Sequence, residues 1–351
     1  MALPETVHRY PGISPRAFQH PADRAATAAL QQVPYLDEVI RKLIELGYER
    51  AVRSAALGSA VRLGEDQLPS IWALQREVYN VLDMTEVPDL YLTQFPFANA
   101  SVIGTGKPIV VVNSELVRLL DADGRRVVLA HEAAHVLADH VLYQTALVIL
   151  MRLVGAVRVP LLAGLPLMAI RTALLEWSRA AELSCDRAAA LVTRNPMAVC
   201  RTMMTLAAGE AANELNLDAF MKQGMDYEKS GGGLEKLTRL LSQLNLTHPM
   251  PVRRTHELLN WVREGEYDRI VGGAYMRRGE EYGAAQEAAG ATIHYGERIR
   301  DAFNDAGQSI ADVGQQLGEW LSKQRGARGA EDAGRGGEDA GDGADGDSGS
   351  A

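Results

Sequence analysis

The string VVLAHEAAHVLADH places His131, Glu132 and His135 in an apolar, helix-forming stretch of the chain. Residues four apart on an α-helix differ by about 40° around its axis after one full turn, so both histidines project from one face and can bind one ion. Glu132 lies about 100° round from His131, where a carboxylate reaches a water on the ion without binding the ion itself. His140 falls on the opposite face of a straight helix and is expected to be structural. This segment is therefore predicted to fold as a helix that turns one polar face into a metal site.

A metal centre that activates water usually has three protein ligands and one open position. The string EWSRAAELSCDRAAAL offers Glu182 and Asp186, which are four residues apart on a predicted helix. One of them can bind the metal while the other hydrogen-bonds a ligand histidine. Glu176 is a competing carboxylate and Cys185 a competing soft ligand, although a thiolate suits a structural zinc site better. These residues alone leave the third ligand open, with Glu182 favoured.

The order of the predicted elements indicates an α+β protein that is predominantly helical. Apolar residues at helical spacing fill residues 22–83, and Pro34 and Pro69 lie where the first turns of helices begin. Short β-rich runs then predict a small sheet between about residues 88 and 113. Helical periodicity returns after the sheet, and Ser114 and Asp123 are the predicted N-caps of the next two helices.

Residues 141–175 are the most apolar part of the chain. Arg152, Arg158 and Arg171 leave uncharged runs of 11 and 12 residues, whereas a membrane-spanning helix needs about 20 predominantly apolar residues. Two prolines in this stretch favour a pair of helices joined by a turn. We therefore predict a helical hairpin packed on the protein body. Peripheral or monotopic contact of the hairpin with a bilayer stays an open alternative.

Composition limits the partners and the compartment. The formal net charge is −9, and residues 326–351 carry seven acidic residues against two arginines. Without clustered basic residues, no nucleic-acid partner is expected. The acidic Gly/Ala/Asp tail has almost no apolar residue beyond alanine and is predicted to be disordered. Cys185 and Cys200 are too few for a disulfide framework, and no secretory signal is visible, so we expect buried, reduced cysteines and a cytoplasmic protein.

The sequence resembles the M48 family of zinc metallopeptidases over roughly residues 88–254. The resemblance rests on four strings in the order of the family: NASVIGTG at 99–106, HEAAH at 131–135, ELSCD at 182–186 and HPMPVRR at 248–254. It implies an HExxH zincin-type metallopeptidase core with a small β-sheet, flanked by helical N- and C-terminal regions. The regions expected are N-terminal helices at 1–85, the zinc metallopeptidase domain at 86–265 with the hairpin at 141–175, C-terminal amphipathic helices at 266–325, and the tail at 326–351.

The resemblance also implies roles at the metal. His131, His135 and Glu182 would bind one zinc ion per chain. Glu132 would be the general base and then the general acid. Asp186 would orient one of the ligand histidines.

Further roles implied by the resemblance concern the polypeptide substrate. His248 and Arg254 would line the cleft near the oxyanion that develops during catalysis. Asn99, Ala100 and Gly104 would belong to an edge strand that binds an extended substrate through its main chain.

We therefore expect a zinc-dependent endopeptidase that acts in protein quality control. Two alternatives remain: a zinc-stabilised scaffold that works through its C-terminal helices, and a latent protease whose terminal regions cover the cleft. The enzyme is favoured because a purely structural site has no need of Glu132 beside the two histidines. The motifs set neither the cleavage-site preference nor the oligomeric state.

Overall fold

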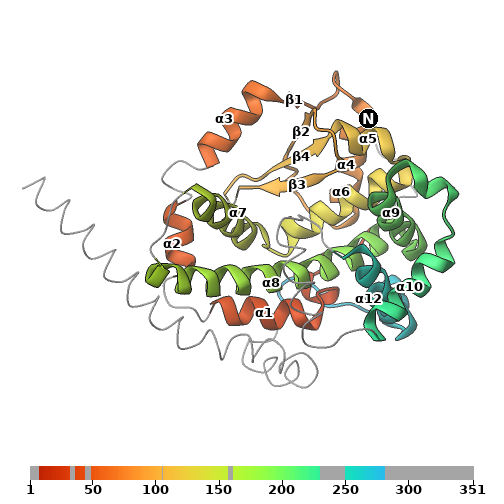
Figure 1. The fold of residues 1–351 in the computed structure, drawn as a ribbon. Helices are drawn as coiled ribbons and strands as arrows, with labels where there is room; N and C mark the ends of the chain where they lie inside the picture. The colour runs from red at the N-terminus through yellow and green to blue at the C-terminus, as the bar shows by residue number, and fades with distance from the viewer. Residues whose placement is uncertain are drawn as a thin grey trace, which may run out of the picture.

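The computed structural model describes residues 8–31, 36–43, 49–104, 106–156, 161–229 and 250–280 (Figure 1). The α-helices are α1 (Pro21–Gln31), α2 (Leu36–Leu43), α3 (Glu49–Ser59), α4 (Pro69–Val81), α5 (Ser114–Leu119), α6 (Ala122–Leu137), α7 (Val141–Ala156), α8 (Leu161–Thr193), α9 (Pro196–Ala208), α10 (Leu217–Lys229), α12 (Pro251–Arg263) and α13 (Glu266–Val271). The strands are β1 (Val61–Arg62), β2 (Asp89–Thr93), β3 (Ala100–Ile103) and β4 (Ile109–Asn113), and 3-10 helices occur at η1 (Pro15–Ala17) and η3 (Gly209–Glu214). A mostly helical chain with one small sheet confirms the predicted α+β class. Of the predicted C-terminal helices, α13 lies within the described residues, whereas 281–351, with the acidic tail, lie outside them.

The sheet has the strand order β1-β2-β4-β3. Its central strands β2 and β4 are parallel, in register from Asp89 opposite Ile109 to Thr93 opposite Asn113. Antiparallel β1 and β3 form the two edges. Three of the four strands lie in the predicted interval. Strand β1 was missed because its two residues, within a stretch interpreted as helical, are too short to show a period of two.

Helix α6 lies between the sheet and α8, and α1 packs on the far side of α8 (Figure 1). Because α6 is covered on opposite sides, the nine consecutive residues 127–135, which include both histidines, are all buried. At 33 residues, α8 is about 50 Å long. Nothing after Pro166 interrupts α8, because the sequence from there to Thr193 contains no further glycine or proline. The second helix of the predicted hairpin and the helix that carries ELSCD are therefore one element.

Two N-cap predictions were wrong by one or two residues. Asp121, not Asp123, caps α6, and its carboxylate accepts a hydrogen bond of 2.8 Å from the amide of Gly124. Asp123 instead lies in the first turn, where a negative charge also suits the helix dipole. Ser114 is the first residue of α5, and Asn113 precedes it as the N-cap. Pro69 begins α4, as predicted.

The N-terminal segment shares the main core with the rest of the chain. Tyr10, Ile13 and Phe18 are completely or almost completely buried among apolar side chains of the sheet, α4, α6, α8 and α9. A second apolar cluster joins α1, α2, α7 and α8 around Trp177, which is completely buried. The first 85 residues therefore form no separately packed unit where the structure describes them.

Helices α7 and α8 contact each other, whereas residues 157–160, where the turn of the predicted hairpin falls, lie outside the described residues. Within the described ranges, no single helix has both the length and the hydropathy to cross a membrane. The helices Ala122–Leu137 and Val141–Met151 meet the requirements of length and hydropathy only when they are counted together, and the pair is bent by 97°. Cys185 and Cys200 are free and buried, as predicted.

Candidate metal centre

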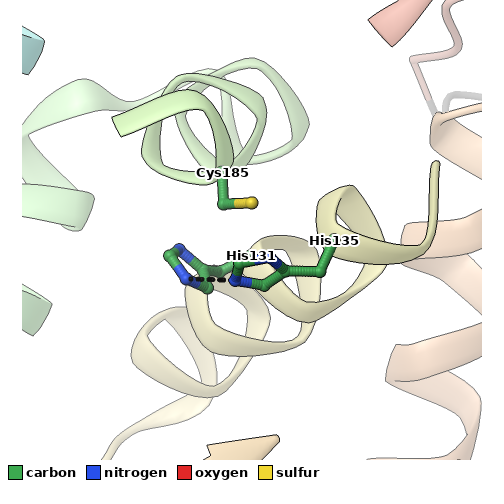
Figure 2. A group of neighbouring side chains, drawn as sticks. All are labelled: His131, His135 and Cys185. Carbon is green, nitrogen blue, oxygen red and sulfur yellow. Dashed lines mark hydrogen bonds between the residues drawn. The ribbon is translucent and has the colours of Figure 1, made fainter. Parts of the chain in front are cut away.

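Helix α6 brings His131 and His135 together on its face toward α8. The imidazoles are 5% and 0% exposed, and their Nε2 atoms lie 3.2 Å apart. Figure 2 shows the two rings side by side on α6, with Cys185 across from them on α8. The four-residue spacing thus places two buried imidazole nitrogens next to one another.

Glu182 of α8 faces both rings. Its Oε2 lies 3.4 Å from Nε2 of His131, and its Oε1 lies 3.4 Å from Nε2 of His135. In a tetrahedral zinc site with metal–ligand distances of about 2.05 Å, neighbouring ligand atoms are roughly 3.3 Å apart. Two nitrogens and a carboxylate at these separations fit a zinc ion.

Cys185 offers another third donor, because its sulfur and one nitrogen of each histidine lie within 4.8 Å of one another. In the metal-free chain, burial, followed by the charges of nearby carboxylates, raises the pKa of the Cys185 thiol well above its ordinary value. A thiolate also suits a closed structural zinc site better than one that keeps an open position for water. Glu182 therefore fits a metal that activates water better than Cys185 does. The other competing carboxylate, Glu176, pairs with Arg179 and is 40% exposed.

Asp186, one turn after Glu182, links His131 to Arg254 of α12. Its Oδ1 lies 3.1 Å from Nδ1 of His131. The guanidinium of Arg254 donates to both oxygens of Asp186, over 2.8 Å from Nε and 2.6 Å from Nη2. Its Nη1 lies 2.9 Å from Oε2 of Glu182. Arg254 thus contacts the carboxylates beside the histidines with all three of its nitrogens.

The two histidines differ in their electrostatic surroundings. Burial lowers the pKa of His131, but the carboxylates of Glu182 and Asp186 outweigh it and raise that pKa to about 9. Burial lowers the pKa of His135 to about 3. Burial raises the pKa of Asp186, yet Arg254 outweighs this effect and holds it below its ordinary value. The cluster thus holds Asp186 as an acceptor for both His131 and Arg254.

Glu132 is 2% exposed and follows His131 on α6. Burial, and then the charge of Glu132, raise the pKa of Tyr79 on α4. The same carboxylate contributes to the raised pKa of Cys185 on α8. Glu132 therefore lies close enough to α4 and α8 to affect the pKa of Tyr79 and of Cys185. In α6 it is next to the face that carries the two imidazoles.

His140 lies nearer to the centre than helical geometry predicted. Helix α6 ends at Leu137, and Asp139 takes a left-handed conformation with φ of 55°, so His140 is not on the opposite face of a continuous helix. Its Nδ1 lies 3.2 Å from Nδ1 of His135. The signal that sequence analysis missed is Asp139, because aspartate tolerates the left-handed conformation that ends a helix.

Asp23 of α1 is a further buried group that sequence analysis missed. It is 0% exposed, and its Oδ2 lies 3.0 Å from Nε2 of His140. Because these two residues are 117 positions apart, no local spacing signals the contact.

Strand β3 is an edge of the sheet, and the predicted substrate-binding residues lie in it or directly beside it. Ala100 begins the strand, the carbonyl of Asn99 accepts a 2.9 Å bond from the amide of Asn113, and Gly104 follows the strand with φ of 97°. The strand contacts both α6 and α7, which brings this edge next to the helix of the two histidines. His248, the remaining predicted site residue, lies outside the described residues.

Comparison with known proteins identifies the family of the chain. The sequence profile of peptidase family M48 matches residues 70–262, which include α6, α8 and nearly all of α12. The plastoglobule-localized metallopeptidase 48, chloroplastic, of Arabidopsis thaliana is 36% identical over 259 residues, covering 72% of this chain and 74% of that protein. No solved structure matches the chain. The predicted resemblance is therefore confirmed, and the chain belongs to peptidase family M48 and is a metalloendopeptidase.

Proposed function

We propose that this chain is a zinc-dependent endopeptidase in which His131, His135 and Glu182 bind the metal and Glu132 is the general base and acid. The observation that carries the proposal is the meeting of three buried donor groups at separations of 3.2 and 3.4 Å, with Glu132 adjacent in the same helix. Two imidazoles and one carboxylate are a common protein ligand set of hydrolytic zinc, and they leave a position for water.

The mechanism follows from these residues. A zinc ion held by His131, His135 and Glu182 would supply Lewis-acid chemistry, lowering the pKa of a water and polarising the carbonyl of the scissile bond. Glu132 would accept the proton of the attacking water and then deliver it to the departing amine nitrogen. Asp186 accepts from Nδ1 of His131, which holds the ring so that Nε2 faces the metal.

Arg254 has a positioning role in this proposal. Its contacts with Asp186 and Glu182 support a function in fixing these two carboxylates, in place of the predicted contact with the oxyanion. We assign the stabilisation of that oxyanion to His248, as the family resemblance implies.

An extended substrate is proposed to lie along β3. In an antiparallel pair, alternate residues direct their main-chain groups toward the partner strand and away from it. The bond between Asn99 and Asn113 places odd-numbered residues of β3 toward β4, so the main chain of Val102 faces away from the sheet. Main-chain pairing at such an edge accepts many unfolded sequences, which supports a role in protein quality control.

The hairpin suggests where such substrates are met. Residues 141–175 are apolar, and the relative from Arabidopsis thaliana is named for plastoglobules, which supports contact of this hairpin with a lipid surface. The cytoplasmic location predicted from the sequence stays a prediction.

The test is cleavage of casein by the full chain and its Glu132→Gln variant, with zinc content measured for both. We expect the wild type to cleave with about one zinc per chain, and Glu132→Gln to keep the metal while losing at least about 10²- to 10⁴-fold in turnover. Glu176→Gln is the matched control, because this carboxylate lies on the same helix α8, is 40% exposed and pairs with Arg179 rather than with a histidine of the centre, and the variant should cleave like the wild type. Turnover that survives in Glu132→Gln, or a wild type without zinc, would overturn the proposal.

A further inference from the structure

The carboxylate of Asp23 is enclosed by polar groups from three parts of the chain. Its Oδ2 lies 2.6 Å from the hydroxyl of Ser184 on α8 and 3.0 Å from Nε2 of His140 in the turn after α6. Its Oδ1 lies 3.2 Å from the hydroxyl of Thr27 on α1 itself. An ionic group so completely buried needs such partners, and Asp23 finds them beside the metal centre.

Fixed donors determine the direction of these hydrogen bonds. The indole N–H of Trp177 donates to Thr27 over 2.9 Å, and the backbone N–H of His20 donates to Ser184 over 2.9 Å. Both hydroxyls are thus used as acceptors, and each directs its own hydrogen toward Asp23. Although burial raises the pKa of Asp23, His140 and the two hydroxyls hold it below its ordinary value. Asp23 is therefore an ionised group that accepts every one of these bonds.

The assignment of donors and acceptors extends from Asp23 through His140 to His135. Because a carboxylate only accepts, His140 donates through Nε2, and with one proton on the ring its lone pair is at Nδ1. That nitrogen lies 3.2 Å from Nδ1 of His135, which is the donor when His140 is in this tautomer. His135 with its proton on Nδ1 has its lone pair on Nε2, the nitrogen beside His131 and Glu182.

Two other neighbours are compatible with this arrangement. The thiol of Cys185 lies 3.7 Å from Nδ1 of His140 and is a weak donor, which suits an acceptor there. The amide of Gln144 lies 3.0 and 3.3 Å from the two nitrogens of His135. A group almost equally far from both ring nitrogens cannot lie along either lone pair, because these point in different directions. Gln144 therefore does not set the position of the proton.

We propose that Asp23, on the N-terminal helix α1, is a positioning residue of the metal centre that acts through His140 to hold His135 in the tautomer that binds metal. The proposal rests on the proposed function, since it takes His135 as a ligand. It adds a contribution from outside residues 70–262, the part matched by the family. It also gives His135 a support equivalent to the one that Asp186 gives His131.

The test compares three variants of the full chain by zinc affinity, measured in competition with a chromophoric chelator. Asp23→Ala removes the acceptor and should weaken zinc binding by about 10- to 100-fold. Asp23→Asn leaves one oxygen to accept from His140 and should bind zinc within about threefold of the wild type. Thr27→Val also removes a contact that holds α1 on α8, yet it spares His140, so it should lower stability and leave zinc affinity within about twofold.

A second measurement does not depend on the folding of a variant. Nitrogen-15 shifts of the imidazole rings in the zinc-loaded wild type should show the proton of His140 on Nε2 and that of His135 on Nδ1. A proton on Nδ1 of His140 would overturn the proposal. So would a folded Asp23→Ala chain that binds zinc like the wild type, or a Thr27→Val chain that loses as much zinc affinity as Asp23→Ala. In each of these cases the wild type still binds zinc and cleaves casein, so the result would contradict the role of Asp23 without contradicting the proposed function.

Discussion

Replacing Asp186 by asparagine would test the buried polar core of the metal centre. The aspartate receives N–H groups from Nε and Nη2 of Arg254 and faces Nδ1 of His131. Asparagine has one acceptor oxygen and an amide that donates, so at least one of these N–H groups loses its acceptor and faces another donor. The variant keeps the volume of the side chain, and the change is therefore electrostatic.

The size of the effect follows from the burial of the ion pair. Breaking a buried ion pair costs about 3–5 kcal/mol, because the remaining charge is desolvated without compensation. Arg254 keeps its 2.9 Å contact with Glu182, which places the expected loss near the lower end, at about 3 kcal/mol. Zinc affinity should fall by about 10- to 100-fold, because His131 loses the acceptor that orients it.

The assay is urea unfolding of the metal-free chain, so that zinc binding does not add to the measured stability, with zinc affinity measured separately. Asp123→Asn is the matched control, because this carboxylate of α6 is 67% exposed and pairs with Arg126 at the surface. It should change stability by no more than about 1 kcal/mol and leave zinc affinity unaltered. The reasoning is refuted if Asp186→Asn unfolds within about 1 kcal/mol of the wild type and binds zinc within twofold of it.

Two further predictions concern pH and the third ligand. Burial lowers the pKa of His20, whose Nδ1 accepts from the amide of Ala22 over 3.1 Å, so its contribution to stability is present above about pH 6.5 and is lost as the pH falls. We expect the urea midpoint of His20→Asn to decline less between pH 7 and 5 than that of the wild type, and equal slopes would contradict this. For the ligand, Cys185→Ala should keep about one zinc per chain whereas Glu182→Gln should lose it, as measured by metal analysis after dialysis; the reverse result would make the cysteine the ligand.

Local periodicity was sufficient to predict the parts of the centre that lie on single helices. The spacing of His131 and His135, and that of Glu182 and Asp186, needs only the pitch of an α-helix. The interval of the sheet was equally accessible, since β-branched residues in short runs are a local signal. The choice between Glu182 and Cys185 as the third ligand could not be made from local sequence, because it depends on which face of α8 meets α6.

Predictions failed where the chain leaves regular geometry or where distant segments meet. His140 was misplaced because the helix ends at Leu137, and a rotation of 100° per residue has no meaning beyond that point. Asp23 could not be found, because its partners are brought to it by the packing of α1 on α8. The contacts of Arg254 with the buried carboxylates of Asp186 and Glu182 could not be predicted either, because they depend on how α12 docks.

The distribution of the centre along the chain has a consequence for biosynthesis. Bonds across 55, 68 and 117 residues connect its parts, and the amide of Arg278 closes back on the carbonyl of Gly12 over 2.7 Å. Contacts between residues so distant in sequence form late in folding, because the entropy cost of closing a long loop comes before the contacts can stabilise the chain. A nascent chain that has exposed HEAAH still lacks Glu182 and Arg254, which leave the ribosome more than 40 and more than 100 residues later. We therefore expect the proposed centre to be assembled only when nearly the whole described chain is present, so that the nascent peptidase is inactive while it is still on the ribosome.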